Sequence, residues 1–342
     1  PLSKDLKKIA VIGPNANEVQ NLICRYGPAN APIKTVYQGI KEYLPDAEVR
    51  YAKGTDIIDK YFPESELYEV PLDQEEQAMM DEAVALAKES DVAIMVLGGN
   101  EKTVREEYSR TNLDLCGRQE KLLQAVHATG KPVILLLVDG RAATINWAER
   151  YIPGIVHAWF PGEFMGDAVA QVLFGDYNPG GRLPLTYYRS LDELPPFDDY
   201  DITKGRTYKY FKGDVLYPFG YGLSYTTFKY SNLQVADGEE EINVSFQLKN
   251  SGKYAGDEVA QVYVKLPERD EIMPIKELKG FERVTLKSGE NKKVTLKLRK
   301  DLLRYWDEAK DKFVCPSGDY TIMVGASSAD IRLQKVVSVL QK

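Results

Sequence analysis

The chain has 342 residues, which is long enough for two domains that each have their own core. Its 44% hydrophobic and 28% charged residues are ordinary for a globular protein. A net charge of −7 without any basic block argues against nucleic acid and anionic membrane as partners, and the longest apolar run, 132–138, is too short to span a bilayer.

The few cysteines and histidines indicate neither a metal centre nor a disulfide framework. Cys24, Cys116 and Cys315 are odd in number and widely separated, so no ligand pair and no disulfide pairing can be read from them. His127 lies in a helical stretch and His157 in an apolar, strand-like one. Neither suggests a metal ligand or a catalytic triad, and we expect no cofactor.

In the first half of the chain, short apolar runs alternate with helical patterns. The alternation predicts an α/β fold, with a mostly parallel sheet that helices cover on both faces. The expected strands are 8–14, which ends in Gly-Pro, then 48–51, 92–97, 133–138 and 155–158. The expected helices are 35–43, 74–89, 119–129 and 164–174.

The helix over 74–89 has the clearest signals. Asp73 is a typical N-cap residue, and apolar side chains recur on one face of the helix. We expect this apolar stripe to be core rather than part of a cofactor site. Its members are Ala78, Met79, Ala83, Leu86 and Ala87.

The loop after the expected strand 92–97 carries three carboxylates, Glu101, Glu106 and Glu107. Ligands of open parallel sheets collect beyond the carboxyl ends of strands, where loops and helix starts converge. The stretch 96–110 is therefore the first place to look for chemistry. A solvated acidic loop is the alternative, and from spacing alone it is the more common case.

After Gly175 the pattern changes. Residues 176–225 are rich in Pro, Gly and aromatic residues, which predicts a connecting segment that its aromatics hold against a domain surface. From Ile242 onward apolar and polar residues alternate in several short runs, and 320–324 closes the series. This pattern predicts a β-sandwich of immunoglobulin-like architecture.

Several long motifs, in the right order, resemble glycoside hydrolase family 3. The resemblance covers nearly the whole chain, as the second domain and the fibronectin type III-like domain of that family. The motifs are 8–17, 113–119, 158–162, 174–184, 217–225 and 276–281. The implied domains are 1–225, an α/β sandwich that includes the connecting segment, and 226–342, a fibronectin type III-like β-sandwich.

The resemblance implies a retaining β-glycosidase that acts on β-linked gluco- or xylo-oligosaccharides. Members carry an aspartate nucleophile on an N-terminal barrel, for which this chain has no Ser-Asp-Trp segment. We therefore expect the chain to begin where the barrel has ended, to need that barrel as a partner, and to be inactive alone. The family also favours a periplasmic or secreted location.

The resemblance places the general acid/base four residues before an arginine, in a Glu-Gly-x-Asp-Arg-like run. Arg110 sets this frame and assigns the role to Glu106, although Glu107 stands at the usual glycine and Ser109 at the usual aspartate. A slip of one residue would assign Glu107 instead. Arg110 itself is expected to pair with a neighbouring carboxylate and shape the loop.

Two further possibilities stay open. Tyr26 matches a family loop that can approach the sugar, and an ordinary surface tyrosine is the alternative. The chain as a whole could also be a non-catalytic scaffold that binds carbohydrate or protein. A proton donor in its frame favours the enzyme, because retaining hydrolysis needs two carboxyl groups about 5–5.5 Å apart, one of which protonates the leaving oxygen.

Overall fold

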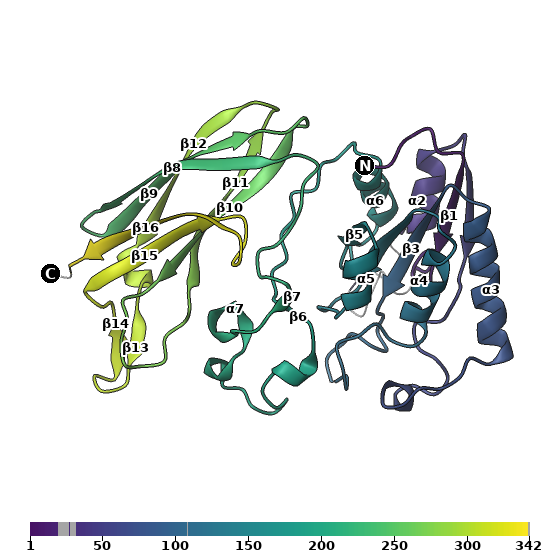
Figure 1. Cartoon of the computed structure of the whole chain (residues 1–342), viewed down its shortest axis with the longest axis horizontal. Helices are drawn as coiled ribbons and strands as arrows, with labels where there is room; N and C mark the ends of the chain where they lie inside the picture. The colour runs from purple at the N-terminus through teal and green to yellow at the C-terminus, as the bar shows by residue number, and fades with distance from the viewer. Residues whose placement is uncertain (20–26, 28–31, 108, 341–342) are drawn as a thin grey trace. The chain divides into compact units, whose positions relative to one another are not determined.

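We describe the protein from a computed structural model, shown as a cartoon in Figure 1. The structure describes residues 1–19, 27, 32–107 and 109–340. These form two compact units, Pro1–Tyr177 and Asn178–Lys342. A domain boundary after Tyr225 stays a prediction, because the connecting segment belongs to the second compact unit here. Within the described ranges, no helix combines the length and the apolar character needed to cross a membrane.

The first unit is built on a parallel sheet of five strands, in the order β2-β1-β3-β4-β5. Every neighbouring pair is parallel, as the sequence predicts. All seven residues of β3 are buried, which explains why its sequence is continuously apolar rather than alternating. The strands are β1 (Lys8–Ile12), β2 (Glu48–Ala52), β3 (Val92–Gly98), β4 (Val133–Val138) and β5 (Gly154–His157).

Helices cover both faces of this sheet (Figure 1). Helices α2 and α6 pack on one face, where Gly39 and Gly166 let the two backbones approach closely: a Cβ on Gly39 would lie 2.2 Å from the Gly166 carbonyl carbon. Helices α3 and α4 lie on the other face. The helices are α2 (Val36–Tyr43), α3 (Gln74–Lys88), α4 (Gln119–His127), α5 (Asn146–Tyr151) and α6 (Met165–Leu173).

Helix α3 begins as predicted, at the N-cap Asp73, whose carboxylate accepts hydrogen bonds from the N–H groups of Glu75 and Glu76. The predicted apolar stripe was wrong at its start, because Ala78 is exposed and Met80 is buried. Met79 and Met80 are adjacent, and either one can lie on the same helix face as Ala83 and Ala87. The sequence therefore did not show which of the two methionines is buried. The short helix α5 has too few turns to show any period, and it was not predicted.

The second unit starts with the connecting segment. This segment contains α7 (Thr207–Tyr210) and a small ribbon formed by β6 (Tyr187–Tyr188) and β7 (Val215–Tyr217). Its aromatic rings pack on one another, as in the stack of Tyr217 on Tyr221 with ring centres 5.2 Å apart. The aromatics thus pack on one another within the segment, and the expectation that they hold it against a domain surface stays a prediction.

Two antiparallel sheets then form the predicted β-sandwich, in the orders β11-β10-β15-β16 and β12-β9-β8. Alternate residues of both sheets, such as Val244 and Phe246 of β9 and Val262 of β10, fill the core between them. The strands are β8 (Phe228–Asp237), β9 (Glu241–Asn250), β10 (Gly256–Lys265), β11 (Glu277–Leu286), β12 (Asn291–Arg299), β15 (Gly318–Gly325) and β16 (Ile331–Val339), with a hairpin of β13 (Tyr305–Asp307) and β14 (Lys312–Val314).

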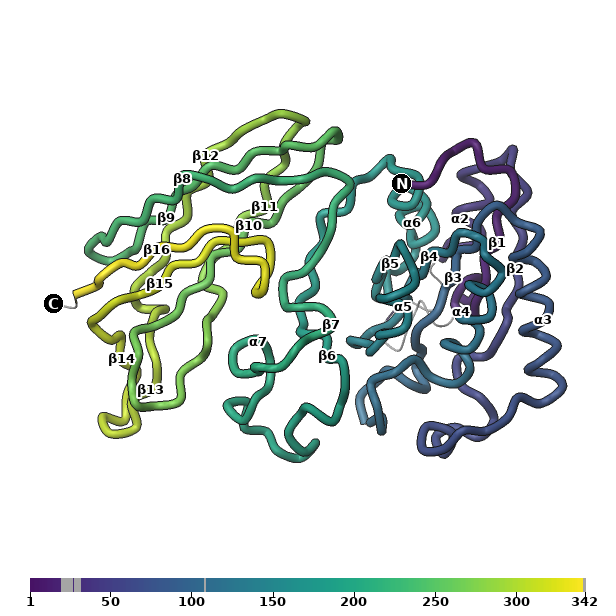
Figure 2. Tube along the Cα trace, viewed as in Figure 1, coloured from purple at the N-terminus to yellow at the C-terminus, as the bar shows by residue number. Residues whose placement is uncertain are grey.

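The expectation that 320–324 is the last strand was wrong. Strand β16 follows it, and the two strands form the yellow hairpin at the end of the trace in Figure 2. Strand β16 is an edge strand in which Ile331, Leu333, Val337 and Val339 are buried or half-buried and alternate with exposed residues, with a break at Lys335. Its apolar period of two was therefore present in the sequence and was missed.

Candidate functional site

The carboxyl edge of the parallel sheet is held together by one buried side chain, Asn15, which follows β1. Its Nδ2 donates hydrogen bonds to the carbonyl oxygens of Gly99, at 3.2 Å, and Val138, at 3.1 Å. These acceptors end or follow β3 and β4. Asn15 therefore ties together three neighbouring strand ends, at the place where open parallel sheets collect ligands.

The loop that follows β3 carries all three candidate carboxylates. It opens with a closed turn, in which the Thr103 hydroxyl accepts from the Asn100 N–H at 3.0 Å. Beyond this turn Glu106 and Glu107 are exposed, whereas Glu101 is half-buried. The loop therefore presents Glu106 and Glu107 outward.

Glu107 has an unusual backbone conformation, with φ of 69°. This left-handed region suits glycine, because a Cβ there approaches the following carbonyl oxygen. The resemblance expects glycine at this position, in the frame that places Glu106 directly before it.

The far end of the loop is anchored by Arg110. Its guanidinium forms an ion pair with Glu66, and both side chains are only 5% exposed. The Thr111 hydroxyl donates to the other Glu66 oxygen at 2.7 Å, and Arg110 Nη2 also donates to the Asp114 carbonyl oxygen at 3.0 Å. The expected role of Arg110, pairing with a carboxylate to shape the loop, is confirmed.

Gln119, the first residue of α4, connects the beginning of the loop with its end. Its Oε1 accepts from the Gly98 N–H at 2.7 Å, while its Nε2 donates to the carbonyl oxygens of Gly98 at 2.8 Å and Cys116 at 3.2 Å. The side chain is fully buried. A single amide thus holds both ends of the stretch that carries Glu106.

Asp139 and His157 lie at the same edge, after β4 and at the end of β5. The His157 Nε2 is 3.1 Å from the Asp139 carbonyl oxygen, and the Asp139 carboxylate accepts from the Arg141 N–H at 3.2 Å. Burial raises the pKa of Asp139 to about 6 and lowers the pKa of His157 to about 4. The imidazole is therefore neutral at neutral pH.

Cys116 is buried at 3% exposure, and burial raises the pKa of its thiol to about 11. A thiol that stays protonated at neutral pH is a packing residue rather than a nucleophile. Across the described ranges, no three His, Cys, Asp or Glu side chains gather where they could hold a metal ion.

The structure brings some predicted residues together and leaves others apart. Glu106 and Glu107 are adjacent on one loop, and Tyr26 lies outside the described residues. Residue-by-residue reading missed Asn15, Glu66, Gln119 and Asp139 as parts of this edge. For Asn15 and Asp139 a signal existed, since each follows a predicted strand directly, whereas Glu66 has no local signal because its partner is 44 residues away.

Sequence comparison places these features among known proteins. The model of the glycosyl hydrolase family 3 C-terminal domain matches residues 1–225, and that of the fibronectin type III-like domain matches residues 258–328. A β-xylosidase from Formosa agariphila is 39% identical over 94% of this chain. A periplasmic β-glucosidase from Salmonella typhimurium is 36% identical over 97% of it. The chain spans only 44% and 46% of these two relatives.

Solved structures agree with the sequence comparison. A β-glucosidase from Erythrobacter marinus superimposes with a TM-score of 0.85 at 33% identity, over 99% of this chain and 47% of the other. A family 3 β-glucosidase from Bifidobacterium adolescentis also gives 0.85, at 30% identity, over 99% of this chain and 50% of the other. The order of an α/β unit followed by a β-sandwich is therefore shared with whole enzymes about twice as long.

Proposed function

Because this chain belongs to glycosyl hydrolase family 3, we propose that it is the part of a retaining β-glycosidase that supplies the general acid/base carboxyl, and that Glu106 is this carboxyl. The observation that carries the assignment is the backbone of Glu107, whose φ of 69° is of the kind that glycine favours. The family pattern has glycine directly after the acid/base residue. This agreement supports Glu106 over Glu107.

The anchoring of the loop supports the same frame. Arg110, four residues after Glu106, is fixed by its ion pair with Glu66, and Gln119 joins the loop ends. A proton donor has to be held within reach of the leaving oxygen, which needs a loop positioned by a rigid scaffold. A loop fixed at both ends meets this requirement.

We expect the second carboxyl from a part of the enzyme other than these 342 residues. The family model that matches is a C-terminal domain, and the chain spans less than half of the two relatives. We propose that an N-terminal barrel supplies the aspartate nucleophile, about 5–5.5 Å from Glu106 as retaining chemistry requires. Glu106 is exposed on this chain, so it lacks the poorly solvated site that a proton donor needs, and the chain alone should be inactive.

The substrate class follows from the relatives, which are named β-xylosidase and β-glucosidase. We propose a β-linked gluco- or xylo-oligosaccharide as the substrate. One relative is named periplasmic, which favours a periplasmic or secreted location for this protein as well.

The test joins this chain to the missing part, taken from the Formosa agariphila β-xylosidase. In this fusion Glu106→Ala should slow hydrolysis of aryl β-glycosides with poor leaving groups far more than of those with good ones, because only a poor leaving group needs a proton. Azide, which needs no base to activate it, should restore turnover on an activated substrate and yield a glycosyl azide.

Glu107→Ala is the matched control. It should keep the parent preference for leaving groups and show no azide effect. Azide rescue of Glu107→Ala instead would move the assignment by one residue. Full activity of both variants would favour the alternative, a scaffold that binds carbohydrate or protein without chemistry.

A further inference from the structure

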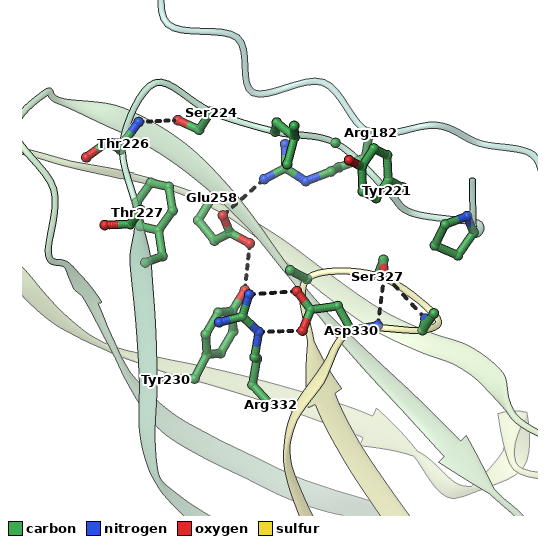
Figure 3. Close-up of a pocket in the computed structure, with 16 residues that line it drawn as sticks. Arg182, Tyr221, Ser224, Thr226, Thr227, Tyr230, Glu258, Ser327, Asp330 and Arg332 are labelled. Atoms are coloured by element: carbon green, nitrogen blue, oxygen red, sulfur yellow. Dashed lines mark hydrogen bonds and ion pairs between the residues drawn. The ribbon is translucent and has the colours of Figure 1, made fainter. Parts of the chain in front are cut away.

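A cavity of about 490 Å³ lies within the second unit and has no part in the acid/base loop. It opens between the connecting segment around Arg182 and 218–227, strand β8 at Phe228 and Tyr230, and strand β10 at Glu258 (Figure 3). The turn 326–330 between β15 and β16, with Arg332 of β16, closes the remaining side. Its volume falls in the range of small-molecule sites, which is about 300–1,000 Å³.

One wall of the cavity is a buried polar network. Arg182 Nη2 lies 3.0 Å from one oxygen of Glu258, and the Tyr230 hydroxyl donates to the other oxygen at 2.7 Å (Figure 3). The Arg182 side chain is 8% exposed and the Glu258 side chain 5%. Burial raises the pKa of Tyr230, so its hydroxyl keeps the proton that it donates.

The network leaves one donor unused. Arg182 Nε is buried and has no hydrogen-bond partner among the described residues. Buried N–H groups nearly always have an acceptor, and leaving one unpaired costs about 1–3 kcal/mol. The atom has almost no accessible surface, so a molecule in the cavity does not reach it, and recognition falls to the hydroxyl-bearing and apolar lining.

The charges that line the cavity cancel. Arg182 pairs with Glu258, and Arg332 pairs with Asp330 by donating from Nε and Nη2 to the two carboxylate oxygens (Figure 3). Two cations and two anions leave no net charge to attract an anion or a cation. The remaining lining mixes hydroxyl groups with apolar surface, including Leu223, which is 71% exposed.

We propose that this cavity binds a neutral sugar of one or two pyranose rings. The sugar hydroxyls contact the hydroxyl-bearing lining at Ser224, Thr227 and Ser327, and the C–H faces of the ring pack on Leu223 and on the rings of Tyr221 and Phe228. Such a ligand matches the lining in both respects, since it carries hydroxyls and apolar faces without charge.

Binding can be measured on the whole chain by calorimetry and ligand-observed NMR, with xylobiose and cellobiose as probes. Only the choice of β-linked probes rests on the proposed function. Ala329→Trp places an indole at the exposed rim of the cavity and should weaken binding at least about tenfold. Ala309→Trp, on an exposed turn outside the cavity, is the matched control and should bind like the parent.

A second pair of variants avoids added bulk. Leu223→Asp removes apolar contact and should also weaken binding, whereas Leu302→Asp, exposed away from the cavity, should not. Glu106→Gln should leave binding unchanged, which separates this site from the acid/base assignment. The proposal would be overturned if all variants bound the disaccharides equally well, or if the parent chain bound neither disaccharide. Binding of glucuronate or phosphate instead of the disaccharides would overturn it as well.

Discussion

Glu66 and Arg110 form a buried ion pair that joins two loops at the carboxyl edge of the parallel sheet, with each side chain 5% exposed. The pair lies at the end of the loop that carries Glu106. Because Arg110 comes only four residues after Glu106, the position of the carboxylate at 66 limits the paths that the intervening chain can take. A residue far from the acidic loop in sequence thus takes part in shaping it.

Removal of Glu66 should therefore destabilise the chain strongly. Glu66→Ala leaves the Arg110 guanidinium buried without its carboxylate, and breaking a buried pair in this way costs about 3–5 kcal/mol. Unfolding in urea measures the loss. Asp301→Ala, which breaks the exposed pair with Arg299, is the control and should cost far less, because solvent screens exposed pairs. Equal losses in both variants would show that the Glu66 pair does not hold the loop.

Glu107→Gly should stabilise the chain. Glycine has no Cβ to strain the φ of 69°, and the relief of about 1–2 kcal/mol exceeds the entropy that glycine adds to the unfolded state, for a net gain of about 0.5–1 kcal/mol. The same urea titration measures this gain. Glu106→Gly is the matched control and should bring none, because the backbone of Glu106 has no positive φ. A loss of stability in Glu107→Gly would contradict the left-handed conformation.

Gln119→Leu should separate the ends of the acidic loop. Leucine fills a similar volume but leaves the Gly98 N–H and the carbonyl oxygens of Gly98 and Cys116 without their partner, at a cost of roughly 2–4 kcal/mol. Thermal and urea unfolding measure the cost. Gln124→Leu on the same helix removes only a side-chain pair with Glu120 and should cost roughly 0.5 kcal/mol or less. Similar values for both glutamines would refute the role of Gln119.

Asp139 and His157 should affect stability in opposite directions as the pH changes. Burial raises the pKa of Asp139 from 3.8 to about 6, so the stability from its proton is complete below about pH 4 and is lost as the pH rises to 6. Burial lowers the pKa of His157 from 6.5 to about 4, so the stability from its neutral ring is present above pH 6.5 and is lost as the pH falls to 4. The two effects largely cancel in the parent.

Single variants should uncover each effect. From pH 7 to pH 4, Asp139→Asn should lose about 1–3 kcal/mol relative to the parent, and His157→Gln should gain a similar amount, at about 1.4 kcal/mol per pKa unit. Urea unfolding measures the free energy of unfolding of each variant and of the parent at both pH values. Subtracting the parent's change from the variant's change removes the contribution of all other titrating groups. Shifts of the same sign in both variants would contradict the opposed pKa changes.

Local pattern was enough to predict much of this protein. Strand β3 is recognisable because a strand buried on both faces is continuously apolar, and helix α3 because Asp73 is a cap that acts on its own next turn. The β-sandwich was predicted from an apolar period of two, as along Ile242–Leu248. The series of strands was ended too early, because β16 keeps the same period at Ile331, Leu333, Val337 and Val339, with a break at Lys335.

The sequence by itself thus determined the two architectures and the loop that carries Glu106, because cap chemistry and apolar period act over a few neighbouring residues. Only the tertiary structure decided that Glu66 receives Arg110, that Gln119 joins the loop ends, and that Arg182 and Glu258 line one cavity. Such contacts join residues as far as 76 positions apart. Their partners are selected by how strands and loops pack, and no local pattern records that packing.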